Sequence, residues 1–188
     1  MQASADPNPG PSPLPDKAPR PDFSELFSTY MPFAWRVLGF MGVSSADQHD
    51  VCQEVFLVVH RRLADFDWSG SVRSWIFGIC VRTASDYRRR KRARPEVPTA
   101  DLPEVEDEEG PDDRFERRRN AARLDAALDA LAEDKRAVFV LYELEELSMS
   151  EVAAAIGCPL QTAYSRLYAA RKELARAFVR SSLPRSHS

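Results

Sequence analysis

The stretch best suited to binding chemistry runs from Trp75 to Arg94 and reads WIFGICVRTASDYRRRKRAR. It begins with aromatic and aliphatic residues, and six of the seven residues from 88 to 94 are basic. Its apolar residues recur every three or four positions, which predicts one helix with a buried stripe. The predicted buried residues are Trp75, Ile76, Ile79, Cys80, Thr83 and Tyr87. The basic end could bind nucleic-acid phosphates or could be only a solvated helix end. Choosing between these two interpretations requires evidence from the other segments of the chain.

A turn-rich loop with two aromatic residues, Phe66 and Trp68, leads into this helix. Aromatic rings beside a basic helix are suited to single-stranded nucleic acid, because each base can stack on a ring for about 1–3 kcal/mol. The alternative is that the rings only fill the base of the core, and for Phe66 this structural interpretation is preferred.

A second candidate binding unit lies near the C-terminus. Ser148-Met-Ser-Glu151 has the form of a capping box and predicts a short helix, which Gly157 and Pro159 should end. A longer helix is expected from Leu160 to Arg180, with one buried stripe and one polar face. The buried stripe is Ala163, Leu167, Ala170, Leu174 and Phe178, and the polar face is Gln161, Tyr164, Ser165, Tyr168 and Lys172. This order of short helix, glycine turn and polar-faced helix is typical of a helix-turn-helix.

Other kinds of chemistry have little support in the sequence. We find no paired carboxylates, no nucleophile beside a base and no phosphate-binding loop, so we expect no enzyme, no small-molecule substrate and no cofactor. The three cysteines, Cys52, Cys80 and Cys158, are far apart and form no metal motif, so buried reduced thiols are expected and no metal. Neither a membrane-spanning run nor a signal peptide is present, which favours a cytoplasmic protein that does not insert into membranes.

The charge distribution predicts how these units are organised. The 188 residues carry a net charge of -3, but residues 95–113 hold nine acidic residues, four prolines and no basic residue, which predicts an extended linker. Seven prolines in residues 1–21 predict a disordered tail. We therefore predict an all-α protein with two small helical domains. Its segments are a tail (1–22), a first domain (23–94), the acidic linker (95–113), a second domain (114–180) and a tail (181–188).

The first domain should begin with two helices before the loop. The apolar pattern from Phe23 continues through Pro32, which should kink or split that helix near residue 31. Ser45-x-x-Gln48 has the form of another capping box and should open the next helix. In the second domain, Asp134 is the expected N-cap of a further helix. On the helix that follows Ser45, one side is polar, and the residues on it are Asp47, Asp50, Gln53 and Glu54.

Three segments resemble one known family, the bacterial extracytoplasmic-function sigma factors. Residues 47–56 (DQHDVCQEVF) resemble the family signature D-A-E-D-L-V-Q-E-V-F, and residues 71–79 (SVRSWIFGI) resemble S-F-R-T-W-L-Y-R-I. Residues 150–171 are similar to the pattern E-I-A…G…T-V-K-S-R-L…A-R. The match covers roughly residues 23 to 178 in the family's order, with the linker between its halves.

The resemblance implies a role for each candidate residue. The face formed by Asp47, Asp50, Gln53 and Glu54 would dock on the clamp helices of the largest subunit of core RNA polymerase. The residues expected to contact the minus-ten element of promoter DNA are Trp68, Ser69, Arg82, Asp86, Arg89 and Arg90. The residues expected to contact the minus-thirty-five element are Thr162, Tyr164, Ser165, Arg166, Tyr168 and Lys172. The acidic linker would occupy a basic channel of the polymerase.

Departures from the family pattern bear on promoter choice. Arg82 replaces a usual asparagine, and its forked cation favours guanine edges or phosphate. Tyr164 replaces a usual lysine or arginine, which removes a phosphate or guanine contact. The family also implies an anti-sigma factor as a partner. The alternative function is a stand-alone helix-turn-helix transcriptional regulator, which would bind its duplex tightly without polymerase.

Overall fold

The computed structural model describes residues 20–93 and 111–182, and only the backbone of residues 111–118 and 179–182. The described chain is helical and contains no strand, so the predicted all-α class is confirmed. Most of the predicted proline-rich tail, of the acidic linker and of the predicted C-terminal tail lies outside the described residues. No helix in the described ranges has the length and apolar content that crossing a membrane would require.

The first helix, α1 (Phe23–Phe40), is one continuous element with Pro32 inside it. Of the two outcomes predicted for Pro32, a kink or a split, the split into two helices is therefore wrong. Asp22 caps its start through a capping box with Glu25. Proline removes one backbone hydrogen bond. The helix nevertheless continues because its inner side buries Ala34, Val37 and Leu38 completely.

The second helix, α2 (Ser45–Arg62), begins where the sequence predicts, but for a different reason. Its N-cap is Ser44, and the predicted capping box between Ser45 and Gln48 is wrong. The Gln48 side chain is buried and donates its amide to the carbonyl of Trp35 in α1 over 2.6 Å. Gln48 therefore joins two helices, because a buried amide needs a partner.

The third helix, α3 (Val72–Ala93), follows the short 3₁₀ turn η1 (Leu63–Asp65). The predicted stripe is right for Ile76, Ile79, Cys80 and Tyr87, which are buried, but Trp75 and Thr83 are only partly buried. Burial also includes Phe77, Gly78 and Ala84, which the predicted stripe omits. The helix buries this wider surface because α1, α2 and α6 all pack against it.

The C-terminal half consists of α4 (Pro111–Asp129), α5 (Glu133–Phe139), the π-helical turn η2 (Val140–Leu144), α6 (Met149–Ile156) and α7 (Leu160–Ser182). The Ser148–Glu151 capping box is present, and Gly157 ends α6 in the left-handed conformation at φ 67°, so both predictions are confirmed. The N-cap of α5 is Ala132, so the prediction of Asp134 is wrong. Phe178, predicted in the buried stripe of α7, is 36% exposed, so this part of the prediction is wrong.

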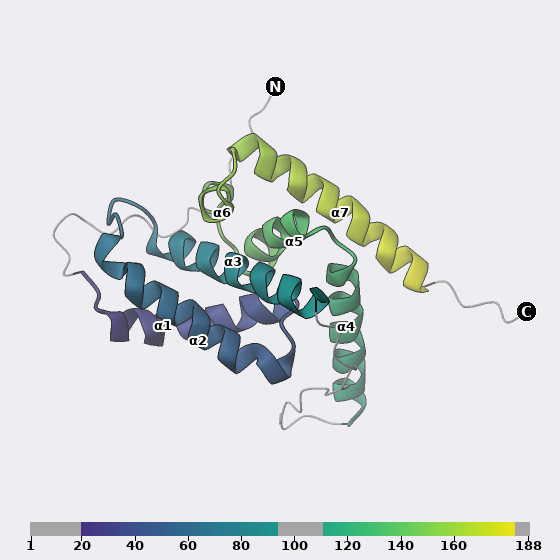
Figure 1. Ribbon diagram of the computed structural model, residues 1–188. Helices are drawn as coiled ribbons and strands as arrows, with labels where there is room; N and C mark the ends of the chain where they lie inside the picture. The colour runs from purple at the N-terminus through teal and green to yellow at the C-terminus, as the bar shows by residue number, and fades with distance from the viewer. Residues whose placement is uncertain (1–19, 94–110, 183–188) are drawn as a thin grey trace, which may run out of the picture.

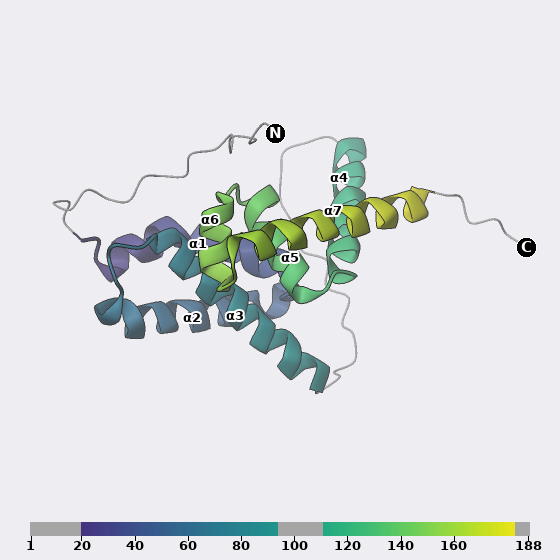
Figure 2. The same cartoon turned by 90° about the horizontal axis from the view of Figure 1, so that it is seen from above.

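The two halves pack against each other and share one hydrophobic core (Figure 1). The most extensive helix contact in the described chain joins α3 of the first half to α6 of the second. Both views show α6 beside the N-terminal half of α3, while α7 extends away from α1–α3 toward its C-terminal end (Figures 1 and 2). The linker between residues 93 and 111 therefore connects two units that already contact each other directly.

Candidate nucleic-acid and protein interfaces

The predicted docking face lies on the outer side of α2. Asp50 and Gln53 are exposed, and the side chain of Asp50 is 85% exposed. Glu54, one helical turn further on, is half-buried and forms an ion pair of 3.0 Å with Arg90 near the end of α3. The acidic face of α2 therefore adjoins the basic end of α3, and a protein partner could contact both charges.

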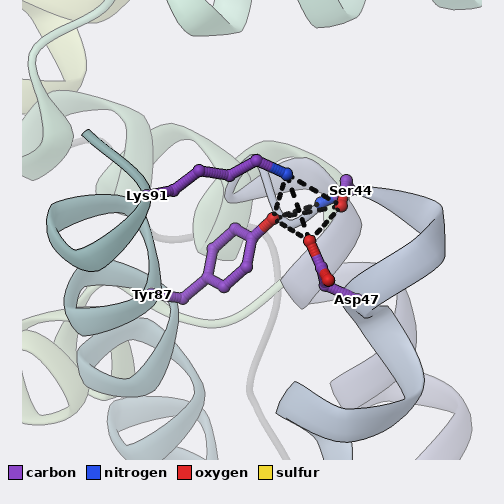
Figure 3. Close-up of polar contacts among 4 residues, drawn as sticks. All are labelled: Ser44, Asp47, Tyr87 and Lys91. Carbon is purple, nitrogen blue, oxygen red and sulfur yellow. Dashed lines mark hydrogen bonds and ion pairs between the residues drawn. The ribbon is translucent and has the colours of Figure 1, made fainter. Parts of the chain in front are cut away.

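Asp47, the first residue predicted for this face, belongs to a polar network between α2 and α3 (Figure 3). Its Oδ2 atom accepts hydrogen bonds of 2.6 Å from both the Ser44 and the Tyr87 hydroxyl, and it pairs with Lys91 Nζ at 3.1 Å. Lys91 also donates to the Tyr87 hydroxyl over 2.9 Å. These contacts attach the start of α2 to the end of α3, so Asp47 already has a structural role besides any docking role.

The network changes the protonation of Asp47. Hydrogen bonds from Ser44 and Tyr87, and then the contact with Lys91, lower the pKa of Asp47 to about 2. A carboxylate with a lowered pKa stabilises the fold above its unfolded pKa of about 3.9 and loses that contribution as pH falls toward its folded pKa. The contribution of Asp47 is therefore complete above about pH 5 and disappears between about pH 4 and pH 2.

We expect a carboxyl-detected NMR titration to give a midpoint of about 2 for Asp47 in the native chain. Tyr87→Phe removes one of the donors and should move this midpoint upward toward the ordinary range. Asp47→Asn should lower the denaturation midpoint at pH 6 more than at pH 3. A native Asp47 that titrates in the ordinary range, unmoved by Tyr87→Phe, would contradict the network.

The loop before α3 is ordered by its own side chains. Asp67 accepts hydrogen bonds from the Ser69 backbone over 3.0 Å and from the Ser69 hydroxyl over 2.7 Å, and these lower the pKa of Asp67. The Phe66 ring lies between two tryptophans, 5.3 Å from Trp68 and 4.6 Å from Trp75 between ring centroids. Phe66 and Trp68 are both half-buried, so the rings brace the loop while part of each stays accessible.

The predicted minus-ten residues on α3 lie on one side of the helix. Arg82, Asp86, Arg89 and Arg90 are exposed, at spacings of four, three and one residues. Arg89 pairs with Asp86, while partial burial and the charge of Arg62 lower the pKa of Arg82. The structure thus places Trp68 and Ser69 in the preceding loop and the four charged residues along α3, with both signs of charge on the same face.

The predicted minus-thirty-five residues lie on α7. Tyr164, Ser165, Tyr168 and Lys172 are exposed, and Tyr168 is 71% exposed. Thr162 is half-buried, and Arg166 is held against α5 by an ion pair of 2.9 Å with Asp134. The Ser165 hydroxyl donates to the carbonyl of Gln161 over 2.9 Å, within the same helix. The outward surface of α7 thus carries aromatic and hydroxyl groups, and Arg171, Lys172 and Arg176 are its exposed cations among the described side chains.

The cysteines are free in this structure: Cys52 and Cys80 are buried, and Cys158 is half-buried. Burial raises the pKa of the Cys52 and Cys80 thiols, which disfavours their reactive thiolate form. Within the described ranges, no group of three or more metal-ligating side chains could hold a metal ion.

Sequence reasoning missed the residues that join the two halves. Arg36 of α1 pairs with Glu145 at 2.9 Å, and Arg136 of α5 donates to the carbonyl of Phe40 over 2.7 Å. Gly78 of α3 lies against the backbone of α6. Periodicity could not find these pairs. The sequence did contain an indication that Gly78 has a special role, because glycine stands here where the family signature quoted above has arginine.

Comparison with known families identifies the class of the protein. The family Sigma-70 region 2 matches residues 26–94, and the family Sigma-70, region 4 matches residues 121–174. These ranges correspond to α1–α3 and to α4–α7. The order of the two matches, with the helix-turn-helix second, places the chain among the sigma factors of bacterial RNA polymerase.

Similarity to individual relatives identifies which family of sigma factors the chain belongs to. The ECF RNA polymerase sigma factor SigE of Mycolicibacterium smegmatis is 32% identical over 161 residues, which are 85% of this chain and 62% of the relative. The ECF RNA polymerase sigma-E factor of Escherichia coli is 30% identical over 141 residues, 70% of this chain and 74% of the relative. The chain belongs to the extracytoplasmic-function (ECF) family of sigma factors.

Solved structures share the fold. The structure of CnrH in complex with the cytosolic domain of CnrY matches with a TM-score of 0.64 and 25% identity, over 86% of this chain and 89% of the matched chain. The sigma factor RpoE of Bartonella quintana, in complex with the anti-sigma factor NepR, matches with a TM-score of 0.66 and 20% identity, over 84% and 96% of the two chains. The latter comparison supports the fold alone.

Proposed function

We propose that the chain is an alternative sigma factor that binds core RNA polymerase and directs it to specific promoters. The observation that carries this proposal is the placement of two exposed surfaces, an acidic face on α2 and a recognition helix α7, on a chain of the ECF family. The protein supplies recognition and no chemistry of its own. It would act in the cytoplasm with the polymerase.

The first half would dock on polymerase and capture the minus-ten element. Asp50, Gln53 and Glu54 would contact the clamp helices of the largest subunit, and Asp47 would hold the start of α2 in place for them. The loop with Trp68 and Ser69 would supply a ring on which an unstacked base can stack, and Arg82, ten residues into α3, would supply a cation further along the DNA strand. The remaining charged residues would lie along the adjoining DNA strand, and they are Asp86, Arg89 and Arg90.

The second half would place α7 in the major groove at the minus-thirty-five element. Tyr164 and Tyr168 are the most prominent exposed aromatic residues of α7, and apolar ring edges suit thymine methyl groups. Thr162 and Ser165 can donate to bases or phosphates, while Arg166 and Lys172 supply positive charge. Because Arg166 is already paired with Asp134, Lys172 would be the stronger phosphate contact.

An anti-sigma factor is proposed as a further partner. Both solved structures described above are complexes with a second protein: CnrH with the cytosolic domain of CnrY, and the sigma factor RpoE with the anti-sigma factor NepR. The acidic linker, largely outside the described residues, is proposed to enter a basic channel of the polymerase.

A stand-alone regulator would bind its DNA without polymerase, whereas a sigma factor needs core enzyme to bind a promoter tightly. We expect the purified chain to shift DNA from upstream of its own gene weakly, and the chain with core enzyme to shift the same DNA at nanomolar concentration. The same DNA with both elements scrambled is the control. Equally tight binding without core enzyme would favour the stand-alone regulator.

The salt dependence of promoter affinity tests the proposal that α7 contacts DNA. Lys172→Ala should reduce the slope of log affinity against log salt by about 0.9, on all promoter sequences alike, because one phosphate contact is lost. Lys135→Ala is the matched control, since Lys135 is occupied by an ion pair of 2.6 Å with Glu173. The experiment measures binding of the holoenzyme to promoter DNA by fluorescence anisotropy. A loss confined to one base substitution would instead indicate direct readout by Lys172.

A further inference from the structure

The Trp68 ring, on which a promoter base would stack, is already in contact with a cation from another part of the chain. The guanidinium carbon of Arg20 lies over this ring, 5.6 Å from its centroid. Arg20 is exposed and Trp68 is half-buried, so both groups are accessible to a ligand in solution. Both views place the start of α1 and the loop before α3 at the same end of the first half (Figures 1 and 2). The contact is a cation–π interaction at the surface.

The start of α1 fixes the backbone next to Arg20. The Asp22 amide donates to Glu25 Oε2 over 3.0 Å, and the Asp22 carboxylate accepts from the Glu25 amide over 2.9 Å. Pro21 stands between this capping box and Arg20. A proline fixes its own φ and restricts the residue before it to extended conformations. Arg20 is therefore attached to a rigid part of the backbone, and its long side chain can adjust.

The loop before α3 supplies no positive charge of its own. Residues 63–72 contain no lysine or arginine, but they contain Asp65 and Asp67, which are both exposed. Hydrogen bonds from Ser69 lower the pKa of Asp67, so this carboxylate is ionised at neutral pH. Two carboxylates repel the phosphates of any DNA strand that approaches the loop. The guanidinium of Arg20 offsets this repulsion at the ring itself.

We propose that Arg20 and Trp68 form the two sides of a binding site for one unpaired base of single-stranded DNA. The base would lie between the indole ring and the planar guanidinium, because both groups stack on nucleic-acid bases. This inference rests on the proposed function, since it needs promoter DNA that is unpaired at the minus-ten element. It adds a residue from outside the family match, because Arg20 precedes the matched residues 26–94.

The present spacing is close to the spacing that a bound base requires. Stacked atoms lie about 3.5–4.0 Å apart, so a base between two planar groups needs about 7–8 Å between them. The guanidinium carbon is now 5.6 Å from the ring centroid, and it would have to move outward by about 2 Å. Rotation about the bonds of the exposed Arg20 side chain can supply this movement. The capping box at the start of α1 would stay intact.

The bound base would replace the contact that it disrupts. A cation–π contact at an exposed site corresponds to about a twofold to fivefold change in affinity, and stacking of a base on a ring contributes more. Once the base is bound, the guanidinium stacks on its second face and keeps a positive charge beside the DNA strand. Arg20 therefore stabilises the bound state, whereas a side chain that only covered the ring would oppose it.

Fluorescence of 2-aminopurine in the DNA tests the site, because this base analogue is quenched when it stacks. Holoenzyme, made from this chain and core enzyme, would be titrated with promoter DNA whose non-template strand is unpaired through the minus-ten element. The analogue would replace one base at a time, and we expect strong quenching at one position. Arg20→Ala should reduce this quenching and weaken binding about twofold to fivefold. Trp68→Ala should weaken binding about fivefold or more.

The matched control is Lys17→Ala, which removes one positive charge three residues earlier in the chain. It should leave both the affinity and the quenching unchanged. Arg20→Lys keeps the charge but lacks the planar group, so it should restore the quenching only in part. In a chain that already carries Trp68→Ala, Arg20→Ala should have little further effect, because both residues contact the same base.

The outcomes separate this site from the proposed function. Tighter binding by Arg20→Ala would mean that Arg20 only covers the ring, and full rescue by Arg20→Lys would indicate a phosphate contact. Either result overturns the site. Quenching at one base that Arg20→Ala leaves unchanged also overturns it, while the proposed function stands. If the unchanged holoenzyme binds no minus-ten DNA, the proposed function fails and the site fails with it.

Discussion

Replacing Asp50 and Glu54 with lysine is expected to abolish binding to core RNA polymerase while both halves stay folded. Both side chains lie on the outer side of α2, and the Glu54 ion pair with Arg90 is largely exposed, with side chains 46% and 58% exposed. An exposed pair contributes only about 0–1 kcal/mol, so the fold should tolerate its loss. At an interface, reversed charges place like charges together, which costs several kcal/mol and weakens binding by about a hundredfold or more.

Affinity-tag co-purification with core enzyme, followed by a titration, measures this loss. The matched control is Asp65→Lys with Glu133→Lys, which makes the same change of charge outside the docking face. Thermal denaturation should give similar midpoints for both double variants. If the Asp50→Lys, Glu54→Lys chain still co-purifies with core enzyme to the same extent, α2 does not form the docking face.

Phe77→Ala is expected to destabilise the chain by about 3–5 kcal/mol, the usual loss for a fully buried phenylalanine. Phe77 is 0% exposed, its ring centroid lies 6.4 Å from that of Phe33, and the Arg73 guanidinium lies 5.7 Å from it. Removing the ring leaves a cavity in the shared core, which neighbouring helices can fill only partly. A loss of this size is a large fraction of the stability of a typical domain.

Urea denaturation followed by circular dichroism measures the change. Trp75→Ala is the informative comparison, because Trp75 is only partly buried and packs on Phe66 at the loop. Its free energy of unfolding should fall less than that of Phe77→Ala, while promoter opening should suffer more. If Trp75→Ala is the more destabilising variant, Trp75 is the core residue that simple periodicity predicts.

Short sequence patterns were sufficient to predict where several helices begin and end. Ser148 with Glu151 and the glycine at position 157 set the ends of α6, and these features act within a few residues of the chain. The same local argument was wrong for Ser45 with Gln48, because a buried amide found a better partner in the Trp35 carbonyl. Local rules therefore identify helix ends well until a tertiary contact competes for the same side chain.

The candidate surfaces were predictable from residue type and family signature, but their internal partners were not. Asp47 was expected only on a docking face, and its bonds to Tyr87 and Lys91 span 40 and 44 residues of sequence. Arg36 and Glu145 are 109 residues apart, and no periodic pattern relates them. The contact between the two halves was missed for the same reason, since an acidic linker indicates separate domains and says nothing of their docking.

The proposed sigma-factor activity is tested most directly by run-off transcription with purified core enzyme on DNA from upstream of this chain's own gene. A transcript of defined length should appear only when core enzyme and this chain are both present, and should disappear with Asp50→Lys, Glu54→Lys or with scrambled promoter elements. If the chain binds core enzyme but no promoter in that DNA or in a randomised promoter library yields a transcript, the proposed function is wrong.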